Sequence, residues 1–397
     1  MFNIFWALLV LFAIAALFRM DWVYYLAYVV GGIWLFSHWW VRRSLSHVEI
    51  QRELNLFAFA GETVDGKVQL NNLSWLPLPW LHIQETVPFD LLDQQNYRSV
   101  VSVPGKAQTV YPYTLRCSKR GYYPIGPLRL NTGDLFGFVD AGWQETRPVH
   151  LTVYPRVFAL EKLGLPSRSP FGSQASRQRL YEDPTRLAGV RDYTPGDSLR
   201  NIHWKATARE DVLQVKKFQP AIALNVTVVL DLNKNAYPIS GAVGSSEWAV
   251  TVAASVASHI VTIQRQQVGL ITNGLDPLAG RIANPIPARN GRGHLMSILG
   301  LLARIQMHEV EPTLADWLPP QLANLDWGST LVVVTPNVDE RALWTLHNAY
   351  RRGSNIVALV CAPDPNFKQM QAQGERLGVQ LYRSVWEKDL HEMAAQG

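Results

Sequence analysis

The sequence predicts a fold of three parts: a membrane α-helical hairpin, a β-sandwich and a doubly wound α/β domain of Rossmann type. Three observations predict it. Two apolar runs begin the chain, a stretch with period-two alternation follows, and strands then alternate with helices to the end. The expected boundaries are 1–43 for the hairpin, 46–157 for the sandwich, 158–222 for a linker with a polar segment, and 223–397 for the α/β domain.

Composition limits the classes of protein that this chain can belong to. Its 397 residues leave room for two or three domains, and 48% hydrophobic against 17% charged residues favours a portion in a membrane. The net charge of +5 suits a neighbouring anionic lipid surface but is too small to predict nucleic-acid binding. Cys117 and Cys361 lie far apart, which favours reduced thiols over a disulfide framework.

The two apolar runs, Phe2–Phe18 and Trp22–Val41, predict a pair of transmembrane helices. They would extend about 25 and 30 Å, against a hydrocarbon core of about 30 Å. Arg42 and Arg43 follow directly, so the positive-inside rule places the remaining domains on the cytoplasmic side. The competing interpretation of the first run is a signal peptide, but no Lys or Arg precedes it.

A β-sandwich is predicted from Val48 to Pro155. Apolar and polar residues alternate in Thr63–Leu70, Leu81–Val87 and Val149–Tyr154, with Gly, Pro and Asn clusters between such runs. No catalytic constellation stands out in this part of the sequence.

From Ala223 the pattern changes to buried strands alternating with helices. Expected strands are 224–232, 268–272, 282–288, 330–335, 356–361 and 379–382, and expected helices are 245–266, 294–306, 314–324, 339–352 and 366–377. Such a sheet binds its ligands at the carboxyl ends of its strands.

A candidate metal site follows the first of these strands. Asp231, Asn233 and Asn235 could direct three oxygens at one cation, and Thr313 and residues 335–339 could add more. Hard divalent ions such as Mg²⁺ prefer oxygen ligands of this kind. The alternative is that Asp231 and Asn233 only cap the following loop, because neutral Asn side chains are poorer ligands than carboxylates.

Several catalytic motifs are absent from the sequence. It contains no G-x-x-x-x-G-K-[ST] loop, so the chain is not itself a P-loop ATPase. It also lacks the G-x-S-x-G and H-E-x-x-H motifs.

The most distinctive stretch runs from Gly189 to Gln219 and combines aromatic residues with charges of both signs. Pro195-Gly196-Asp197 predicts a tight turn within it. The residues able to make specific contacts are Arg191, Tyr193, Asp197, Arg200, His203, Trp204, Lys205 and Arg209. The alternative is a solvated basic connector.

This stretch contains RDYTPGDSLRNIHWKATARED and is preceded by KRGYYPIGPLRL. With the predicted hairpin, the chain resembles the bacterial domain of unknown function 58 (DUF 58) family over nearly its whole length. The family-signature positions are Arg191, Tyr193, Pro195, Gly196, Asp197, Arg200, Trp204, Lys205 and Arg209.

The resemblance implies a von Willebrand factor A-like domain after the signature and a place in the bacterial cytoplasmic (inner) membrane, with the other domains facing the cytoplasm. It also implies pairing with a MoxR-type AAA+ ATPase in chaperone-like assembly or maturation of other proteins, and no enzymatic activity. The metal site of such domains resembles Asp-x-Ser-x-Ser. Here Asn233 and Asn235 replace both hydroxyls, Thr313 fits the second loop, and Asn337 or Asp339 stands in the third, which weakens the expectation of Mg²⁺.

We therefore expect a membrane-anchored, non-enzymatic scaffold that binds protein partners. Trp204 and Tyr193 would anchor the signature in an aromatic pocket, and its basic residues would pair with Asp197 as an interdomain clamp. This hypothesis places Trp204 and Arg209 in the interior and the basic residues around 177–186 at the surface.

Two other classes remain open. One is a metal-dependent hydrolase that uses Asp231 with His203 as its base. The other is lipid-headgroup or nucleic-acid binding by the basic segment, against which its mixed charges argue.

Overall fold

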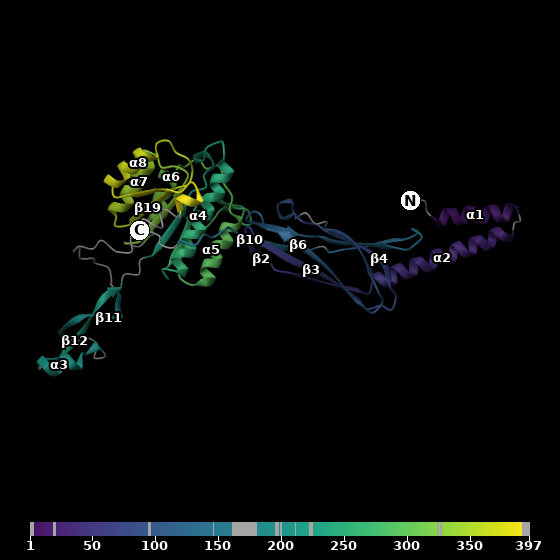
Figure 1. The fold of residues 1–397 in the computed structure, drawn as a ribbon, viewed down its shortest axis with the longest axis horizontal. Coiled ribbons are helices and arrows are strands. Elements are labelled where there is room, and N and C mark those ends of the chain that lie inside the picture. The colour runs from purple at the N-terminus through teal and green to yellow at the C-terminus, as the bar shows by residue number, and fades with distance from the viewer. Residues whose placement is uncertain are drawn as a thin grey trace. The chain divides into compact units, whose positions relative to one another are not determined.

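The computed structural model describes residues 4–18, 21–93, 97–145, 147–160, 181–194, 198, 201–210, 212–221, 225–323, 325 and 328–390. The chain divides into two compact units. The first comprises residues 1–156 and 299–305, and the second comprises residues 157–298 and 306–397. We describe each unit by itself (Figure 1).

Two helices, α1 (Ile4–Phe18) and α2 (Asp21–Leu45), begin the first unit and lie side by side (Figure 1). Within the part of the chain that the structure describes, no helix is both long and apolar enough to cross a membrane. The 15 residues of α1 extend only about 22 Å. The longer α2 is rich in Tyr and Trp and includes Ser37 and His38, which lower its hydropathy.

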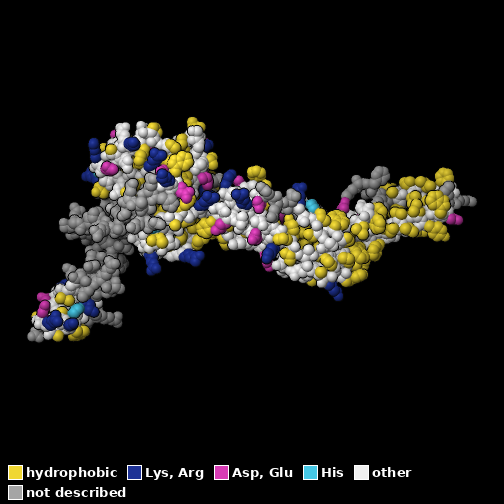
Figure 2. Space-filling model, viewed as in Figure 1, with side chains coloured by type: hydrophobic (Ala, Val, Ile, Leu, Met, Phe, Trp, Pro, Cys, Tyr) yellow, Lys and Arg dark blue, Asp and Glu magenta, His cyan; other side chains and the backbone are white. Residues whose placement is uncertain are grey.

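The predicted transmembrane hairpin is therefore wrong, and so is the expectation of an integral membrane protein with two helices. Helix α1 is too short for the predicted span, and α2 is long enough but too low in hydropathy. Figure 2 shows hydrophobic side chains over most of the visible face of α1 and α2. Trp6, Leu17 and Trp22 are among the exposed large hydrophobic residues of these helices. The predicted cellular location stays a prediction.

Three sheets follow in the first unit. The first has the order β1-β3-β6, with β1 (Val48–Leu54), β3 (Thr63–Asn72) and β6 (Gln108–Arg116). The second has the order β5-β4-β8-β9, with β5 (Arg98–Val103), β4 (Leu78–Glu85), β8 (Leu128–Gly133) and β9 (Asp140–Gln144). The third has the order β2-β10-β7, with β2 (Phe57–Phe59), β10 (Val149–Tyr154) and β7 (Gly121–Ile125). All pairs are antiparallel except β2 with β10.

One hydrophobic core joins these sheets. Side chains along β3 alternate between exposed and buried, as the period-two pattern predicted. Leu70 from β3, Leu81 from β4 and Leu130 from β8 are fully buried in the same cluster. Burial of side chains of this size contributes about 2 kcal/mol each, so this shared core is the main source of the unit's stability.

The signature stretch in the second unit forms a hairpin with a short helix rather than an irregular linker. Strand β11 (Tyr181–Asp192) pairs antiparallel with β12 (Gln214–Ala221), and α3 (Trp204–Glu210) lies between them in sequence. Isolated bridging of Ile202 with Val215 extends the pairing, and both side chains are buried.

The rest of the second unit is built on a six-stranded sheet in the order β17-β14-β13-β18-β19-β20. The strands are β13 (Val226–Leu230), β14 (Val268–Thr272), β17 (Ile286–Arg289), β18 (Thr330–Thr335), β19 (Asn355–Val360) and β20 (Gln380–Arg383). All neighbours are parallel except β17 with β14. Two shorter strands, β15 (Leu275–Asp276) and β16 (Arg281–Ile282), pair with each other outside this sheet.

Helices connect these strands, as the alternation predicted. They are α4 (Ala242–Thr262), α5 (Arg292–Arg304), α6 (Leu314–Leu322), α7 (Glu340–Arg351) and α8 (Phe367–Arg376). Val229 and Val333 pack with residues of α6 and α7 on one face of the sheet. Helix α4 contacts β13, β14 and β18. Strands β13, β14 and β18 are buried along their entire lengths, which matches their near-continuous apolar sequences.

Candidate functional site

A cavity of about 200 Å³ opens at the carboxyl edge of the six-stranded sheet. It lies after the ends of β13 and β18. The strand order changes direction here, because β14 pairs with one side of β13 and β18 with the other, which makes this the topological switch point of the sheet. Sheets of this type bind ligands at such a switch point. The cavity brings together all the predicted metal-site residues, and its lining includes Asp231, Asn233, Asn235, Glu311, Thr313, Asn337 and Asp339.

Asp231 lies at the bottom of this site and is only 1% exposed. Its Oδ1 accepts hydrogen bonds from the backbone N–H of Asn233 (3.0 Å) and from Nδ2 of Asn273 (2.8 Å). Its Oδ2 accepts a bond from the Thr335 hydroxyl at 3.2 Å. Burial raises the pKa of Asp231, and these three hydrogen bonds oppose that rise.

Asn273 is the residue of this site that the sequence interpretation missed. It follows β14 directly, and its Oδ1 also accepts the backbone N–H of Leu232 at 2.6 Å. The available signal was its position after a buried strand, the same position that Asp231 occupies after β13.

The side chain of Asn233 shapes the loop after β13 and is held by it. Asn233 Nδ2 donates to the carbonyl of Val310 at 2.9 Å, and its Oδ1 accepts the backbone N–H of Asn235 at 3.1 Å. Asn233 also caps the short 3₁₀ helix η3 (Lys234–Ala236). Both ends of the Asn233 amide are therefore engaged within the chain, as the loop-capping alternative predicted.

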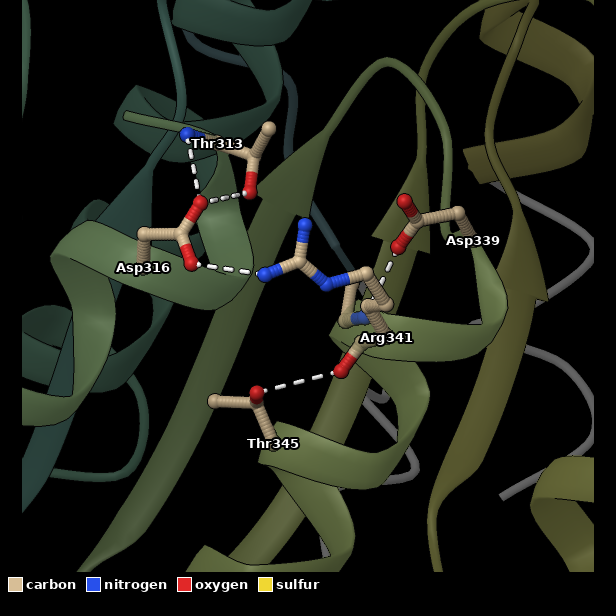
Figure 3. Close-up of polar contacts among 6 residues, drawn as sticks. Thr313, Asp316, Asp339, Arg341 and Thr345 are labelled. Atoms are coloured by element: carbon tan, nitrogen blue, oxygen red, sulfur yellow. Dashed lines mark hydrogen bonds and ion pairs between the residues drawn. The ribbon is translucent and has the colours of Figure 1, made fainter. Parts of the chain in front are cut away.

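Thr313 and Asp339 begin helices at the rim of the cavity. Figure 3 shows Asp316 accepting from both the backbone N–H (3.3 Å) and the hydroxyl (2.7 Å) of Thr313 at the start of α6. The other oxygen of Asp316 pairs with Arg341 at 3.0 Å. Asp339 caps α7 by accepting the backbone N–H of Ala342 at 2.7 Å.

The oxygen-bearing side chains of this site do not fit a magnesium ion. The carboxylate of Asp231 is already bonded to three protein donors, and the amide of Asn233 to backbone groups. Octahedral Mg²⁺ would need several hard oxygens directed at one point. Among the described residues, no group of three or more His, Cys, Asp or Glu could hold a metal.

The signature residues lie elsewhere, and the prediction that Trp204 and Arg209 are internal is wrong. Trp204 is 69% exposed at the start of α3, and Lys205 and Arg209 are exposed on the same helix. A helix of seven residues can cover few of its own side chains, because only one stripe faces β12. Pro195, Gly196, Asp197 and Arg200 lie outside the described residues, as do residues 177–180 and the side chains of residues 181–186, the predicted basic surface.

Hydrogen bonds from Gln214 hold α3 against the hairpin. Its backbone N–H donates to the Thr207 hydroxyl at 3.0 Å, and its backbone carbonyl accepts the N–H of His203 at 2.8 Å. Its buried side chain donates to Asp192 Oδ1. Arg191 donates to the Thr194 hydroxyl at 3.3 Å, and the backbone N–H of Tyr193 donates to the carbonyl of Leu213.

His203 has a structural role at the start of α3. Its Nδ1 accepts the backbone N–H of Ala206 at 3.1 Å, which caps the helix. His203 does not line the cavity that contains Asp231. The described residues thus give no site in which His203 acts as a base beside Asp231.

Comparison with known proteins gives a family match over part of the chain and one distant relative. Residues 189–333 match the family model described as "Protein of unknown function DUF58". The uncharacterized protein YeaD of Bacillus subtilis (strain 168) is 24% identical over 258 residues, which cover 64% of this chain and 61% of that protein.

Similarity to solved structures is partial. The native α-2-macroglobulin of Escherichia coli gives a TM-score of 0.24 at 18% identity, covering 27% of this chain and 16% of that chain. The open conformation of the pilus adhesin SpaC from Lactobacillus rhamnosus GG gives a TM-score of 0.31 at 11% identity, covering 45% of this chain and 30% of that chain. TM-scores this low identify no function.

Proposed function

Since this chain carries a DUF58 family segment at residues 189–333, we propose that it is a non-enzymatic scaffold that binds protein partners. The partner class is a MoxR-type AAA+ ATPase, which the family resemblance implies, and the role is assembly or maturation of other proteins.

The observation that carries the proposal is the exposure of Trp204 beside Lys205 and Arg209 on α3. Trp and Arg dominate the binding energy of protein interfaces, because they bury a large area and form directional polar bonds. The neighbouring Val212 and Leu213 are exposed as well and extend the apolar surface. We call Trp204, Lys205, Arg209, Val212 and Leu213 the signature surface.

The chemistry of the signature surface specifies the partner's surface. An apolar pocket is required for the Trp204 indole, and acidic groups around that pocket would pair with Lys205 and Arg209. Mixed charges nearby, including Glu210 on the same helix, favour a protein over a nucleic acid or a lipid headgroup.

We further propose that the α/β part of the second unit is a von Willebrand factor A-like domain. Its support is the strand order, which reads 3-2-1-4-5-6 when β13 is counted first, with β17 as an antiparallel edge. A second support is the cavity at the switch point. In this chain Asp231, which lines the cavity, is held by hydrogen bonds from Asn233, Asn273 and Thr335.

The hydrolase alternative has little support from these residues. Asp231 and His203 are each bonded within the chain, and neither presents a free group to a shared cavity. The scaffold proposal therefore accounts for both residues as structural groups.

Co-elution tests the scaffold proposal. The full chain and the purified MoxR-type ATPase of the same organism are mixed with ATP and passed over a size-exclusion column. We expect a complex that elutes before either protein alone. Separate elution at all nucleotide states would overturn the proposed partner.

A further inference from the structure

The core of the first unit contains a charged cluster that the scaffold function does not use. Arg52 on β1, Glu85 at the end of β4 and Glu145 directly after β9 come together there. The side chains of Arg52 and Glu85 are 6% and 0% exposed, whereas that of Glu145 is 35% exposed. Burial of charge at this depth is costly unless every charge is paired and hydrogen-bonded.

Pairing in the cluster is unequal. Arg52 Nη2 donates to Glu145 Oε2 at 2.7 Å, but lies 3.3 Å from Glu85 Oε1. Neither carboxyl oxygen of Glu85 forms a hydrogen bond with the described residues, so the 3.3 Å approach to Arg52 is an ion pair without a directed bond. Glu85 is therefore the under-bonded member, and its ionised form is the least stable charge in the cluster.

Among the described residues, Arg52 is the positive side chain that pairs with the glutamates of this cluster. From β6, Tyr113 and Tyr111 face the cluster, and burial raises the pKa of both, so they stay neutral phenols. Tyr97 lies beside Tyr113 with ring centroids 6.5 Å apart, and burial raises its pKa too. On β8, the residue paired with Glu85 is the apolar Leu128.

The charge balance follows directly. With both glutamates ionised, the cluster holds two negative charges and only one positive charge, that of Arg52. A proton on Glu85 makes the cluster neutral and leaves Arg52 paired with Glu145. We propose that Glu85 is a buried proton-binding site that makes the stability of the sandwich depend on pH near neutrality.

The direction in which the pKa of Glu85 is shifted decides whether the stability of the fold rises or falls with pH. Burial raises the pKa of Glu85 from 4.5 to about 7; Arg52 lowers it and Glu145 raises it. The folded chain therefore holds this proton more tightly than the unfolded chain. Its stabilising contribution is complete below the unfolded pKa and is lost as the pH rises through the folded value.

The test uses the full chain and the variant Glu85→Gln, which keeps the shape of the side chain without its charge. Hydrogen exchange of peptides from β1 and β4 reports on the sandwich at several pH values from about 5 to about 8. After correction for intrinsic exchange, we expect the wild-type opening equilibrium to increase at least about tenfold across this range, since one pKa unit corresponds to a factor of ten. We expect the opening equilibrium of Glu85→Gln to stay constant across the same pH range.

The exposed Glu49→Gln on β1 is the matched control and should keep the wild-type slope. The proposal is overturned if the opening equilibrium of Glu85→Gln changes with pH as much as that of the wild type. It is also overturned if the opening equilibrium of the wild type does not change with pH. If Glu85→Gln does not fold, ¹³C-carboxyl NMR of the wild-type protein decides. One buried glutamate carboxyl titrating near neutrality supports the site, and titration of all glutamates near their ordinary values overturns it.

Discussion

Nδ2 of Asn273 lies 2.8 Å from Oδ1 of Asp231, and this bond joins the ends of β14 and β13. From the other side, the Thr335 hydroxyl at the end of β18 bonds to Oδ2 of the same carboxylate. Three neighbouring parallel strands are thus held at their carboxyl ends by one buried side chain. This arrangement stabilises the carboxyl edge of the sheet.

Asp231→Ala should destabilise the α/β part of the chain. The change leaves the amide of Asn273 and the backbone N–H of Asn233 without this acceptor, whereas the Thr335 hydroxyl keeps the carbonyl of Asn337 as its acceptor. The two lost bonds cost about 3 kcal/mol. Scanning calorimetry should show one transition at a lower temperature. The exposed Glu375→Ala on α8 is the control and should leave that transition in place. An unchanged transition in Asp231→Ala would show that the carboxylate has no such role.

Magnesium should have no effect on this domain. A ligand at about 100 times its Kd stabilises a folded protein by about 2.7 kcal/mol, which calorimetry detects easily. We expect equal Tm values in millimolar MgCl₂ and in EDTA, because the donors around Asp231 are bonded to the chain. A Tm that rises with MgCl₂ in the wild type but not in Asp231→Ala would contradict this expectation.

Gly66→Ala should destabilise the sandwich, although alanine is normally preferred to glycine in a strand. A Cβ at residue 66 would overlap the ring of Tyr113, which packs over the glycine from β6. Overpacking of this kind costs about 1–3 kcal/mol. Chemical denaturation measures the loss, and the double variant with Tyr113→Ala should show less than additive destabilisation. Strict additivity would mean that the ring and the glycine do not interact.

Charge reversal on the signature surface should slow the association with the ATPase. Lys205→Glu combined with Arg209→Glu changes two exposed side chains, so the circular dichroism spectrum should stay the same. The association rate constant at low salt should fall about tenfold or more and lose its salt dependence. Stopped-flow measurement at several salt concentrations checks this, and an unchanged rate constant would remove the basic residues from the interface.

Much of the fold could be predicted because hydrophobic periodicity is a local signal. Strands β14 and β18 have the predicted bounds, since each is a continuous apolar run between polar residues. The role of Asn273 could not be predicted, because its contact with Asp231 depends on the order of strands in the sheet. For α3, seven residues with a Trp and three charges carry no helical apolar stripe.

The exposure of Trp204 was also beyond local reasoning. An aromatic residue among charges fits a buried anchor or an interface anchor equally well in sequence, and only the packing of α3 on β12 distinguishes them. The two apolar runs at the start were misjudged for a different reason. The first run forms a helix of only 15 residues. The Tyr and Trp residues of the second run count as hydrophobic in composition but contribute little hydropathy to α2.

The dissociation constant of the ATPase complex with Trp204→Ala tests the scaffold proposal most directly. The control is Trp386→Ala, which removes an indole of similar exposure (65% against 69%) away from the signature segment. We predict that Trp204→Ala weakens binding about 30-fold or more, as loss of an interface anchor does, and that Trp386→Ala binds like the wild type. Equal dissociation constants for the two variants would contradict the proposed role of the signature surface.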